Sequence, residues 1–297
     1  MAIAVGVEGF GASSPRRRLR LDVVAPQRGR WQTAAVVAVV VLHPGAMGTA
    51  VGAALLDAGH RVFWVGAGRS DATRSRAEAG GLDEVSSLEA LAADAEVVLS
   101  ICPPHAAADV AGAVVGVGFT GLYVDANAIA PDHVRELATV VDAAGGQFVD
   151  GGIIGPPSRT AGATSLYLSG PRAGEVGDLF ADTIIDAHVV DERIGSASAT
   201  KMTFAAWTKG TNALVLALAG VAEREGVTGA LRTAWARWLP DLEGRLEAAS
   251  AAAARKGWRW TGEMREIART FAAAGEPAGF GDAAADVFER FDRPANE

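Results

Sequence analysis

The sequence contains a single cysteine, Cys102, among its 297 residues. One cysteine excludes an internal disulfide and a cysteine-built zinc site, and this usage fits a reducing compartment. Histidine is also scarce, and because the five histidines are scattered along the chain we expect no metal site. The chain lacks the G-x-S-x-G elbow of serine hydrolases, the Walker lysine loop and the H-E-x-x-H zinc motif.

Basic residues are outnumbered, since 27 Lys and Arg face 35 Asp and Glu and the formal net charge is −8. A general nucleic-acid binder needs a phosphate-facing excess of basic residues, so we expect no nucleic-acid partner. Long apolar runs are missing as well. The runs at 34–42 and 213–222 have about half the length of a membrane span. We therefore expect a cytoplasmic protein without a membrane partner.

The chain divides into three parts by pattern. Residues 1–33 are rich in arginine and lack apolar periodicity, so we expect a flexible N-terminal arm. From 34 to 194, β-branched runs alternate with helical stretches, which predicts a doubly wound Rossmann sheet that binds a dinucleotide. From 195 to 297 the pattern is helical, which predicts an all-α domain for substrate binding and dimerisation. The predicted fold class is therefore α/β, with an all-α C-terminal domain joined to the sheet by a long helix.

The expected elements follow from hydrophobic periodicity and from turn residues. Strands are predicted at 36–42, 61–65, 97–101, 122–125, 147–149, 165–168 and 188–190. Helices are predicted at 49–58, 71–79, 87–92, 106–115, 132–144 and 173–185, and the long helix over about 199–225.

The first predicted strand ends in a glycine turn that leads into a helix. A strand, a glycine turn and a helix start form the unit that places a pyrophosphate on a helix N-terminus. Two of the three glycines of G-x-G-x-x-G remain here, because a histidine holds the first position. The residues predicted to contact the dinucleotide are His43, Pro44, Gly45, Ala46, Met47 and Gly48.

The second predicted strand lacks the acidic residue that would bind the ribose 2′-hydroxyl of NAD. The chain instead continues through Arg69, Ser70 and Arg74. These side chains are suited to hold a 2′-phosphate through charge-assisted hydrogen bonds. The pattern therefore favours NADP over NAD, while a solvated loop before a helix is the other interpretation.

Three further strands end in residues that are suited to a binding site. Cys102, Pro103 and Pro104 follow the strand at 97–101, at the sheet edge where dinucleotides lie, and we predict that they contact the cofactor. Nothing marks Cys102 as a nucleophile. Asn127 follows the next strand and offers donors and an acceptor to a substrate hydroxyl, carbonyl or carboxylate. The glycines of 151–155 allow close backbone approach to a ligand, although turn chemistry alone also explains them.

Lys201 lies at the start of the long predicted helix. A lysine that is half-desolvated beside a cofactor is able to act as a general acid or base. From the residues alone, a solvated helix lysine is the alternative.

Taken together, four stretches resemble the β-hydroxyacid dehydrogenase superfamily, which includes 6-phosphogluconate dehydrogenase and the imine reductases. The stretches are 42–48, 124–131, 201–210 and 262–268. The sequence is similar in particular to a branch of 6-phosphogluconate-dehydrogenase-like NAD(P)-binding proteins that carry a C-terminal helical domain of unknown function. The resemblance covers about residues 36–290.

The resemblance implies a dinucleotide on the glycine turn and a substrate between Asn127, a loop at 151–155 and Lys201. Lys201 matches the catalytic lysine of the family, which protonates or deprotonates the substrate oxygen, and Asn127 would orient the substrate. A homodimer through residues after 195 is also implied, and the apolar helix face Met264, Ile267, Ala268, Phe271 and Ala274 supports it. The substrate contacts expected on this basis are Gly152, Ile153, Ile154, Thr208 and Met264.

Three positions depart from the family pattern. His43 replaces the first glycine of the turn. Ala205 stands where the family has an asparagine four residues after the lysine, and Thr208 or Asn212 would be more distant substitutes. Ile154 stands where the hydroxyacid enzymes have a carboxylate-binding serine. The last two changes make the predicted pocket more apolar than a small hydroxyacid needs.

The leading functional prediction is NADP-dependent hydride transfer between the nicotinamide and a C–OH/C=O centre of a small hydroxyacid-like substrate. Reduction of C=N, as in the imine reductases, is the first alternative, and Ile154 would suit an apolar amine. Against it, imine reductases commonly carry Asp or Tyr where this chain has Lys201. A non-catalytic NADPH-binding protein is the second alternative, supported by the changes at His43 and Ala205.

Overall fold

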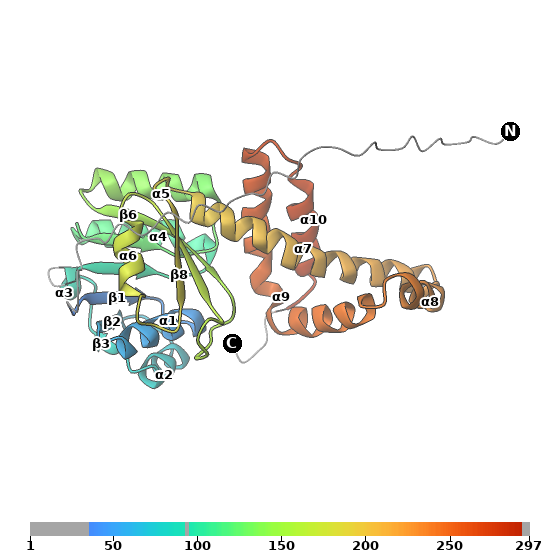
Figure 1. Cartoon of the computed structure of the whole chain (residues 1–297), viewed down its shortest axis with the longest axis horizontal. Helices are drawn as coiled ribbons and strands as arrows, with labels where there is room; N and C mark the ends of the chain where they lie inside the picture. Colours follow the sequence, from blue (N-terminus) through green and yellow to red (C-terminus); the bar gives the residue numbers. More distant parts are fainter. Residues whose placement is uncertain (1–35, 93–94, 293–297) are drawn as a thin grey trace, which may run out of the picture.

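The computed structural model describes residues 36–92 and 95–292, so the arm predicted at 1–33 lies outside the described residues. An eight-stranded sheet forms one end of the molecule, with the strand order β3-β2-β1-β4-β5-β6-β7-β8 (Figure 1). The first six strands in this order follow the Rossmann arrangement. The strands are β1 (Ala38–Leu42), β2 (Arg61–Val65), β3 (Asp83–Val85), β4 (Val97–Ser100), β5 (Leu122–Asp125), β6 (Gln147–Ile154), β7 (Ser165–Ser169) and β8 (Asp186–Asp191).

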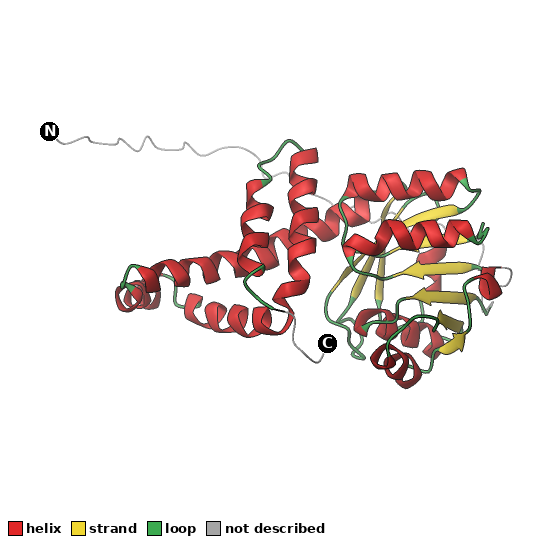
Figure 2. Ribbon diagram, turned by 180° about the vertical axis from the view of Figure 1, so that it is seen from behind, coloured by secondary structure: helices red, strands yellow, loops and turns green. Residues whose placement is uncertain are grey.

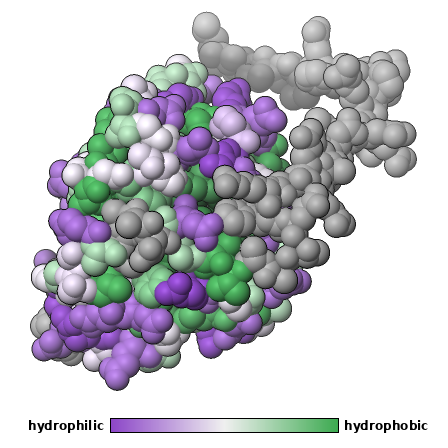
Figure 3. Space-filling model, turned by 90° about the vertical axis from the view of Figure 1, so that its left-hand side faces the viewer, coloured by the Kyte–Doolittle hydropathy of each residue, from purple (hydrophilic) through white to green (hydrophobic). Residues whose placement is uncertain are grey.

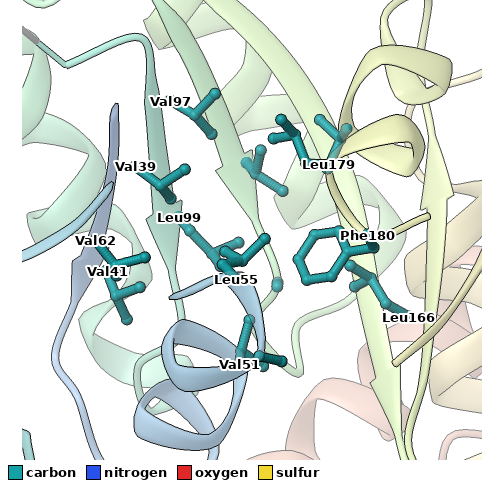
Figure 4. Close-up of a cluster of buried hydrophobic side chains, with 14 of the residues drawn as sticks. Val39, Val41, Val51, Leu55, Val62, Val97, Leu99, Leu166, Leu179 and Phe180 are labelled. Carbon is teal, nitrogen blue, oxygen red and sulfur yellow. The ribbon is translucent and has the colours of Figure 1, made fainter. Parts of the chain in front are cut away.

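Helices cover both faces of the sheet, which confirms the predicted doubly wound α/β class (Figure 2). One face packs against α1 (Ala46–Asp57), α2 (Asp71–Ala79) and α6 (Ala173–Leu179). Figure 4 shows part of this core, where Val39 and Leu99 of the sheet meet Leu55 of α1. The other face packs against α4 (Ala107–Gly116) and α5 (Pro131–Ala143). Since both faces are covered, the central strands β1 and β4 are buried at every position, and they are valine-rich runs rather than alternating apolar and polar residues.

The sheet-bearing part of the chain differs from the expectation in three places. β6 continues to Ile154 instead of ending at 149, because its second half pairs with β7 in antiparallel orientation. The helix predicted over 173–185 ends at Leu179 and is followed by a turn before β8. β3 was not predicted, since a three-residue acidic edge strand carries little hydrophobic pattern. Two short elements complete this part of the chain, α3 (Glu89–Ala92) and the 3₁₀ turn η1 (Pro104–Ala106).

The rest of the described chain is helical. α7 (Ser196–Arg224) runs for 29 residues from the edge of the sheet into this part (Figure 1). It is followed by α8 (Thr228–Trp238), α9 (Leu242–Ala273) and α10 (Gly279–Phe288). Met202 of α7, Met264 and Ile267 of α9 and Phe288 of α10 form the core between these helices, and each is at most 1% exposed. The helix face around Met264 therefore packs within its own protomer, and most of it is not free for a second subunit.

Large apolar side chains are exposed elsewhere on the helical part. Thr203 to Ala217 of α7, together with α9 and α10, border an apolar groove of about 850 Å³ that includes the exposed rings of Trp207 and Phe280. The sheet-bearing end of the molecule instead presents a surface on which hydrophilic and hydrophobic residues are mixed (Figure 3). Within the described ranges, no helix is both long enough and apolar enough to cross a lipid bilayer.

Candidate functional site

The glycine turn lies at the carboxyl end of β1, where the strand order reverses between β1 and β4. Ligands of open α/β sheets bind at such a reversal. A Cβ on Gly48 would stand 3.1 Å from the carbonyl oxygen of His43 and 3.3 Å from a methyl group of Val41, so this helix start tolerates little beyond glycine. No side chain caps the N-terminus of α1, which leaves its first amides available. These features fit the phosphates of a dinucleotide.

His43 adopts φ 63°, the left-handed conformation that glycine favours, and is the one non-glycine residue with positive φ in the described chain. The histidine thus preserves the tight turn that the missing glycine would make. Its Nδ1 atom is buried and has no hydrogen-bond partner among the described residues. Burial, and next the charge of Arg69, lower the pKa of His43 to about 4, so the imidazole is neutral at pH 7. An unpartnered polar atom at this turn is suited to a ligand hydroxyl.

The residues after β2 differ in how many hydrogen bonds and ion pairs their side chains form within the protein. The Ser70 hydroxyl accepts a hydrogen bond from the Thr73 amide at 3.3 Å and caps α2. Arg74 pairs with Glu84 of β3 and donates to the carbonyl oxygen of Gly66 at 3.2 Å. Arg69 is exposed and forms no ion pair within the part of the chain that the structure describes. Glu84 was not anticipated, because its partner Arg74 lies on another element.

A row of buried polar residues crosses the sheet near the carboxyl ends of the parallel strands. Ser100, Asp125, Asp150 and Ser169 are register neighbours on β4, β5, β6 and β7. All four are fully buried. We call these four residues the polar row. Burial raises the pKa of Asp125 to about 7, although hydrogen bonds from Asn127 lower it in part.

Asn127 ties this row to the turn after β4. Its Nδ2 group donates to Ser100 at 3.0 Å and to Asp125 at 2.7 Å, while its Oδ1 accepts from the Cys102 amide at 2.6 Å. Both side-chain N–H donors are therefore engaged within the protein. The residue that we expected to face a substrate holds the turn of Cys102 and Pro103 in place.

Cys102 is half-buried, and Pro103 is exposed at the same edge of the sheet. Burial raises the pKa of the Cys102 thiol to about 12, so the thiol stays protonated at neutral pH. This environment agrees with the sequence-based view that Cys102 is not a nucleophile.

Asp150 fixes the start of α7 on the sheet. Its Oδ2 accepts hydrogen bonds from the backbone amides of Gly195 and Ser198, each at 3.0 Å, and from the Ser169 hydroxyl at 2.9 Å. Its Oδ1 accepts from the Ser198 hydroxyl at 2.6 Å. The carboxylate therefore satisfies amides at the helix N-terminus, where negative charge is also favourable. The sequence does not reveal this role, because the two amides that Asp150 accepts from lie 45 and 48 residues away.

Gly152 lets α7 approach β6 closely. A Cβ at this position would lie 2.7 Å from the carbonyl oxygen of Ala197 and 3.0 Å from the Cβ of Lys201. The expected substrate loop at 151–155 is thus mainly strand, and Gly152 serves helix packing. Ile153 is buried in the sheet core, and Ile154 is half-buried at the strand end.

Lys201 lies on the second turn of α7 and faces α9. Its Nζ stands 3.7 Å from Oε1 of Glu263, and Lys209 pairs with Oε2 of the same carboxylate. The two lysine side chains are 17% exposed and the glutamate side chain 10%. We call Lys201, Lys209 and Glu263 the lysine–glutamate cluster. Burial lowers the pKa of Lys201, with Glu263 opposing and Lys209 assisting this shift.

The remaining predicted contacts are spread over the helical part. Met264 is 1% exposed in the helical core and also lines the apolar groove. The Thr208 hydroxyl donates to the carbonyl oxygen of Phe204 at 3.2 Å, within its own helix. Ala205, where the family has asparagine, is buried against the same core. In the described ranges, no cluster of three or more His, Cys, Asp or Glu residues is arranged to hold a metal ion.

Two stretches of the chain match known families. Residues 38–176 match the NAD binding domain of 6-phosphogluconate dehydrogenase, and residues 222–291 match a domain of unknown function, DUF1932. An uncharacterized 28.5 kDa protein in the 7S RNA 5′ region of Methanothermus fervidus is 28% identical over 160 residues. That match covers 54% of this chain and 61% of the relative, which is less than two thirds of its length.

Several solved structures share the fold. A conserved protein described as structurally similar to 3-hydroxyacid dehydrogenases is 25% identical, with a TM-score of 0.63 and coverage of 86% of this chain and 96% of its own. The 3-hydroxyisobutyrate dehydrogenase of Mycobacterium tuberculosis, with L-serine, is 17% identical, with a TM-score of 0.67 and coverage of 86% and 94%. A reductive aminase from Aspergillus terreus in complex with NADPH and ethyl-5-oxohexanoate is 18% identical, with a TM-score of 0.55 and coverage of 86% and 93%. The matches confirm the resemblance that the four sequence stretches indicated.

Proposed function

We propose that this chain, in which an NAD-binding domain of the 6-phosphogluconate dehydrogenase kind precedes a DUF1932 domain, is an NADP-dependent oxidoreductase. Its substrate would be a small hydroxyacid-like molecule that is oxidised or reduced at a C–OH/C=O centre. The proposal rests mainly on the placement of Lys201. This lysine is largely buried, and it lies on a helix that Asp150 fixes to the carboxyl edge of the sheet. The dinucleotide turn lies at the end of β1 in the same sheet.

The cofactor would lie on the turn from His43 to Gly48, with its phosphates at the uncapped N-terminus of α1. Arg69 would meet the 2′-phosphate of NADP. Arg74 would contribute less, because Glu84 already neutralises it. A bound nicotinamide supplies or accepts the hydride at the substrate carbon.

Lys201 would be the acid and base of the reaction. In the reducing direction, an N–H bond of its ammonium breaks as the new O–H bond of the product alcohol forms. In the oxidising direction, the neutral amine takes that proton back. A general acid works best when its pKa lies near the operating pH, and burial lowers the pKa of Lys201 towards that range. Asn127 would act indirectly, by holding the turn at Cys102.

The charge of the lysine–glutamate cluster favours an anionic substrate. Two ammonium groups face one carboxylate, which leaves one positive charge in a mostly buried place. A carboxylate of a hydroxyacid would complete this balance. A protonated imine is a cation, and it would be repelled by the same residues.

Imine reduction is the second candidate function, and the apolar end of β6 favours it. Ile154 presents an apolar side chain at the end of β6 where the hydroxyacid enzymes have serine, and an amine substrate suits such a surface. The fold is also shared with a reductive aminase. The lysine–glutamate cluster argues in the opposite direction.

The deciding experiment is turnover by wild type and by the Lys201→Met variant on panels of carbonyl and imine substrates with NADPH. Methionine keeps the helix, so NADPH affinity should change little. Loss of proton transfer should lower carbonyl reduction by about 10²–10⁴-fold. The Lys256→Met variant, in which an exposed lysine of α9 is changed, is the matched control.

A modest loss on an imine would favour C=N reduction, because an iminium already carries its proton. Full activity of the Lys201→Met variant would remove Lys201 from the mechanism. NADPH binding without turnover on either panel would favour a non-catalytic NADPH-binding protein.

The assembly would be a cytoplasmic homodimer that joins through the helical parts of two copies. The groove between α7, α9 and α10 and the exposed apolar residues of α7 support this arrangement, since soluble monomers rarely leave large apolar patches open. A second copy of the chain offers the matching apolar surface.

A further inference from the structure

Lysine is the rarest basic residue of this protein. The sequence has three lysines and 24 arginines, and two of the three lysines meet at one glutamate. Arginine stays charged at every accessible pH, whereas a buried lysine is able to lose its proton. Lysine at both positions around Glu263 therefore allows proton loss there, which arginine would not allow.

The two lysines are held differently by the shared carboxylate. Lys209 forms a close ion pair with Oε2 of Glu263, and its ammonium also lies 5.9 Å from the ring centroid of Trp260. Lys201 stands 3.7 Å from Oε1, which is beyond ordinary hydrogen-bond distance. That Oε1 atom is buried and accepts no hydrogen bond from the described residues.

We propose that Glu263 is a positioning residue for Lys201, and that Lys209 is the counter-charge of Glu263. Lys209 engages Oε2 of the carboxylate closely, which leaves Lys201 as the loosely held ammonium of the two. Removal of Glu263 would then lower the pKa of Lys201, whereas removal of Lys209 would raise it. This inference rests on the proposed role of Lys201 as acid and base.

The electrostatics of the cluster agree with this division. Burial raises the pKa of Glu263, but Lys209 and, to a smaller extent, Lys201 outweigh it and keep the carboxylate ionised. The groups that act on Lys201 are Glu263 from α9 and Lys209 from α7 itself. β6 approaches Lys201 with Gly152, and the nearby Asp150 is engaged with the amides of the α7 N-terminus.

The test measures the protonation of Lys201 directly, without turnover. Wild type, Glu263→Gln and Lys209→Met are exposed to acetic anhydride over a range of pH, and acetylation of each lysine is quantified by mass spectrometry. Only a neutral amine reacts. In Glu263→Gln, Lys201 loses its anion and keeps a cationic neighbour, so it should react at lower pH than in wild type. In Lys209→Met the anion acts alone, and Lys201 should react at higher pH.

Each shift of one pKa unit changes the rate at a fixed lower pH about tenfold. Lys256, exposed on α9, serves as the internal reference and should keep one profile in all proteins. The double variant Glu263→Gln/Lys209→Met removes both charges and should return Lys201 towards the wild-type profile. If Glu263→Gln alone fails to fold, the double variant replaces it. The effect of Glu263 on Lys201 is then the difference between the acetylation profiles of the double variant and of Lys209→Met.

Shifts in the same direction, or unchanged Lys201 profiles in the variants, would overturn the proposal. The pH–rate profile of turnover should move with the acetylation profile in each variant. Should Lys201→Met keep full activity while the opposite shifts are present, the charge relationship would stand and the proposed acid–base role would fail. The two failures are therefore distinguishable.

Discussion

The sheet region and the helical region of this molecule bury their apolar side chains to very different extents. All five residues of β1 are at most 6% exposed. On α7, Trp207 is 68% exposed and Leu214 59%, and on α10 Phe280 is 71% exposed. Nine of the thirteen large hydrophobic residues that are exposed in the described chain belong to the helical region.

The two regions cover their apolar side chains to different degrees within one chain. Layers of helices close both faces of the sheet, so this region builds its core alone. The helical region has a small core of its own around Met202 and Met264 but leaves an open apolar groove. This openness is the basis for the proposed dimer, in which a second copy would cover the groove.

The largest expected effect on stability comes from Asp150, which joins the two regions. The Asp150→Ala variant leaves two backbone amides and two hydroxyls without their buried acceptor. Loss of such a network should lower the free energy of unfolding by about 3–5 kcal/mol. Chemical denaturation followed by circular dichroism measures it, with Asp142→Asn as an exposed control. A loss below that of the control variant would show that the helical region is held by other contacts.

Asp125 should make the stability of the sheet region depend on pH. Its pKa in the folded protein is raised to about 7, so folding favours the protonated form. The stability contribution is present below the unfolded pKa and is lost as pH rises to about 7. The loss is on the order of 4 kcal/mol at most, for a shift of three units.

The measurement compares wild type with Asp125→Asn in denaturant titrations at pH 5 and pH 8. The stability of wild type relative to the variant should fall between these two values, because the asparagine does not ionise. A difference that is the same at both pH values would mean that Asp125 is ionised throughout.

The Leu214→Glu variant tests whether the helical region needs a second copy. A charge placed in an apolar interface should weaken association by about 2–3 kcal/mol, or roughly a hundredfold in the dissociation constant. Light scattering at micromolar concentration should show a dimer for wild type and a shift to monomer for the variant. The exposed position Glu247, changed to Gln, is a control. A monomeric wild type would refute the dimer and leave the groove without its proposed occupant.

The smallest effect concerns cofactor choice in the sheet region. Arg69 forms no ion pair with the rest of the described chain, whereas Arg74 is paired with Glu84. We expect Arg69→Ala to weaken NADPH binding about tenfold, and Arg74→Ala to weaken it less. Neither change should affect NADH. Calorimetric titration of both cofactors measures these effects, and equal affinity of wild type for NADPH and NADH would contradict the proposed preference.

Local patterns were enough for much of the sheet region. β2 at 61–65 and β5 at 122–125 lie where hydrophobic runs predict them, because both strands are bounded by clear turn residues. The predicted β6 was too short, because Gly151 and Gly152 indicate a turn. The sequence does not reveal that α7 packs against Gly152 and that the segment after β5 approaches Gly151. The antiparallel pairing of β7 has no local signal at all.

The candidate site was predictable where one motif carries it and not where distant residues meet. The glycine turn and Lys201 follow from short stretches of sequence. Glu263 lies 54 residues after its partner Lys209, and only the packing of α9 on α7 brings the two together. Asn127 was expected to face a substrate, because the sequence does not reveal that Ser100, Asp125 and the Cys102 amide occupy its hydrogen-bonding groups.

The polar row also limits how this protein can be recombined with its relatives. A chimera that takes its sheet from one parent and its helices from another would have its junction near residue 195. This junction lies between Asp150 and Ser198, whose side chains form a hydrogen bond of 2.6 Å. Matching only the residues at the junction would leave this contact to chance. Asp150, Ser169 and Ser198 should therefore be taken together from one parent. A chimera that keeps all three should fold with α7 docked on the sheet, and one that separates them should not.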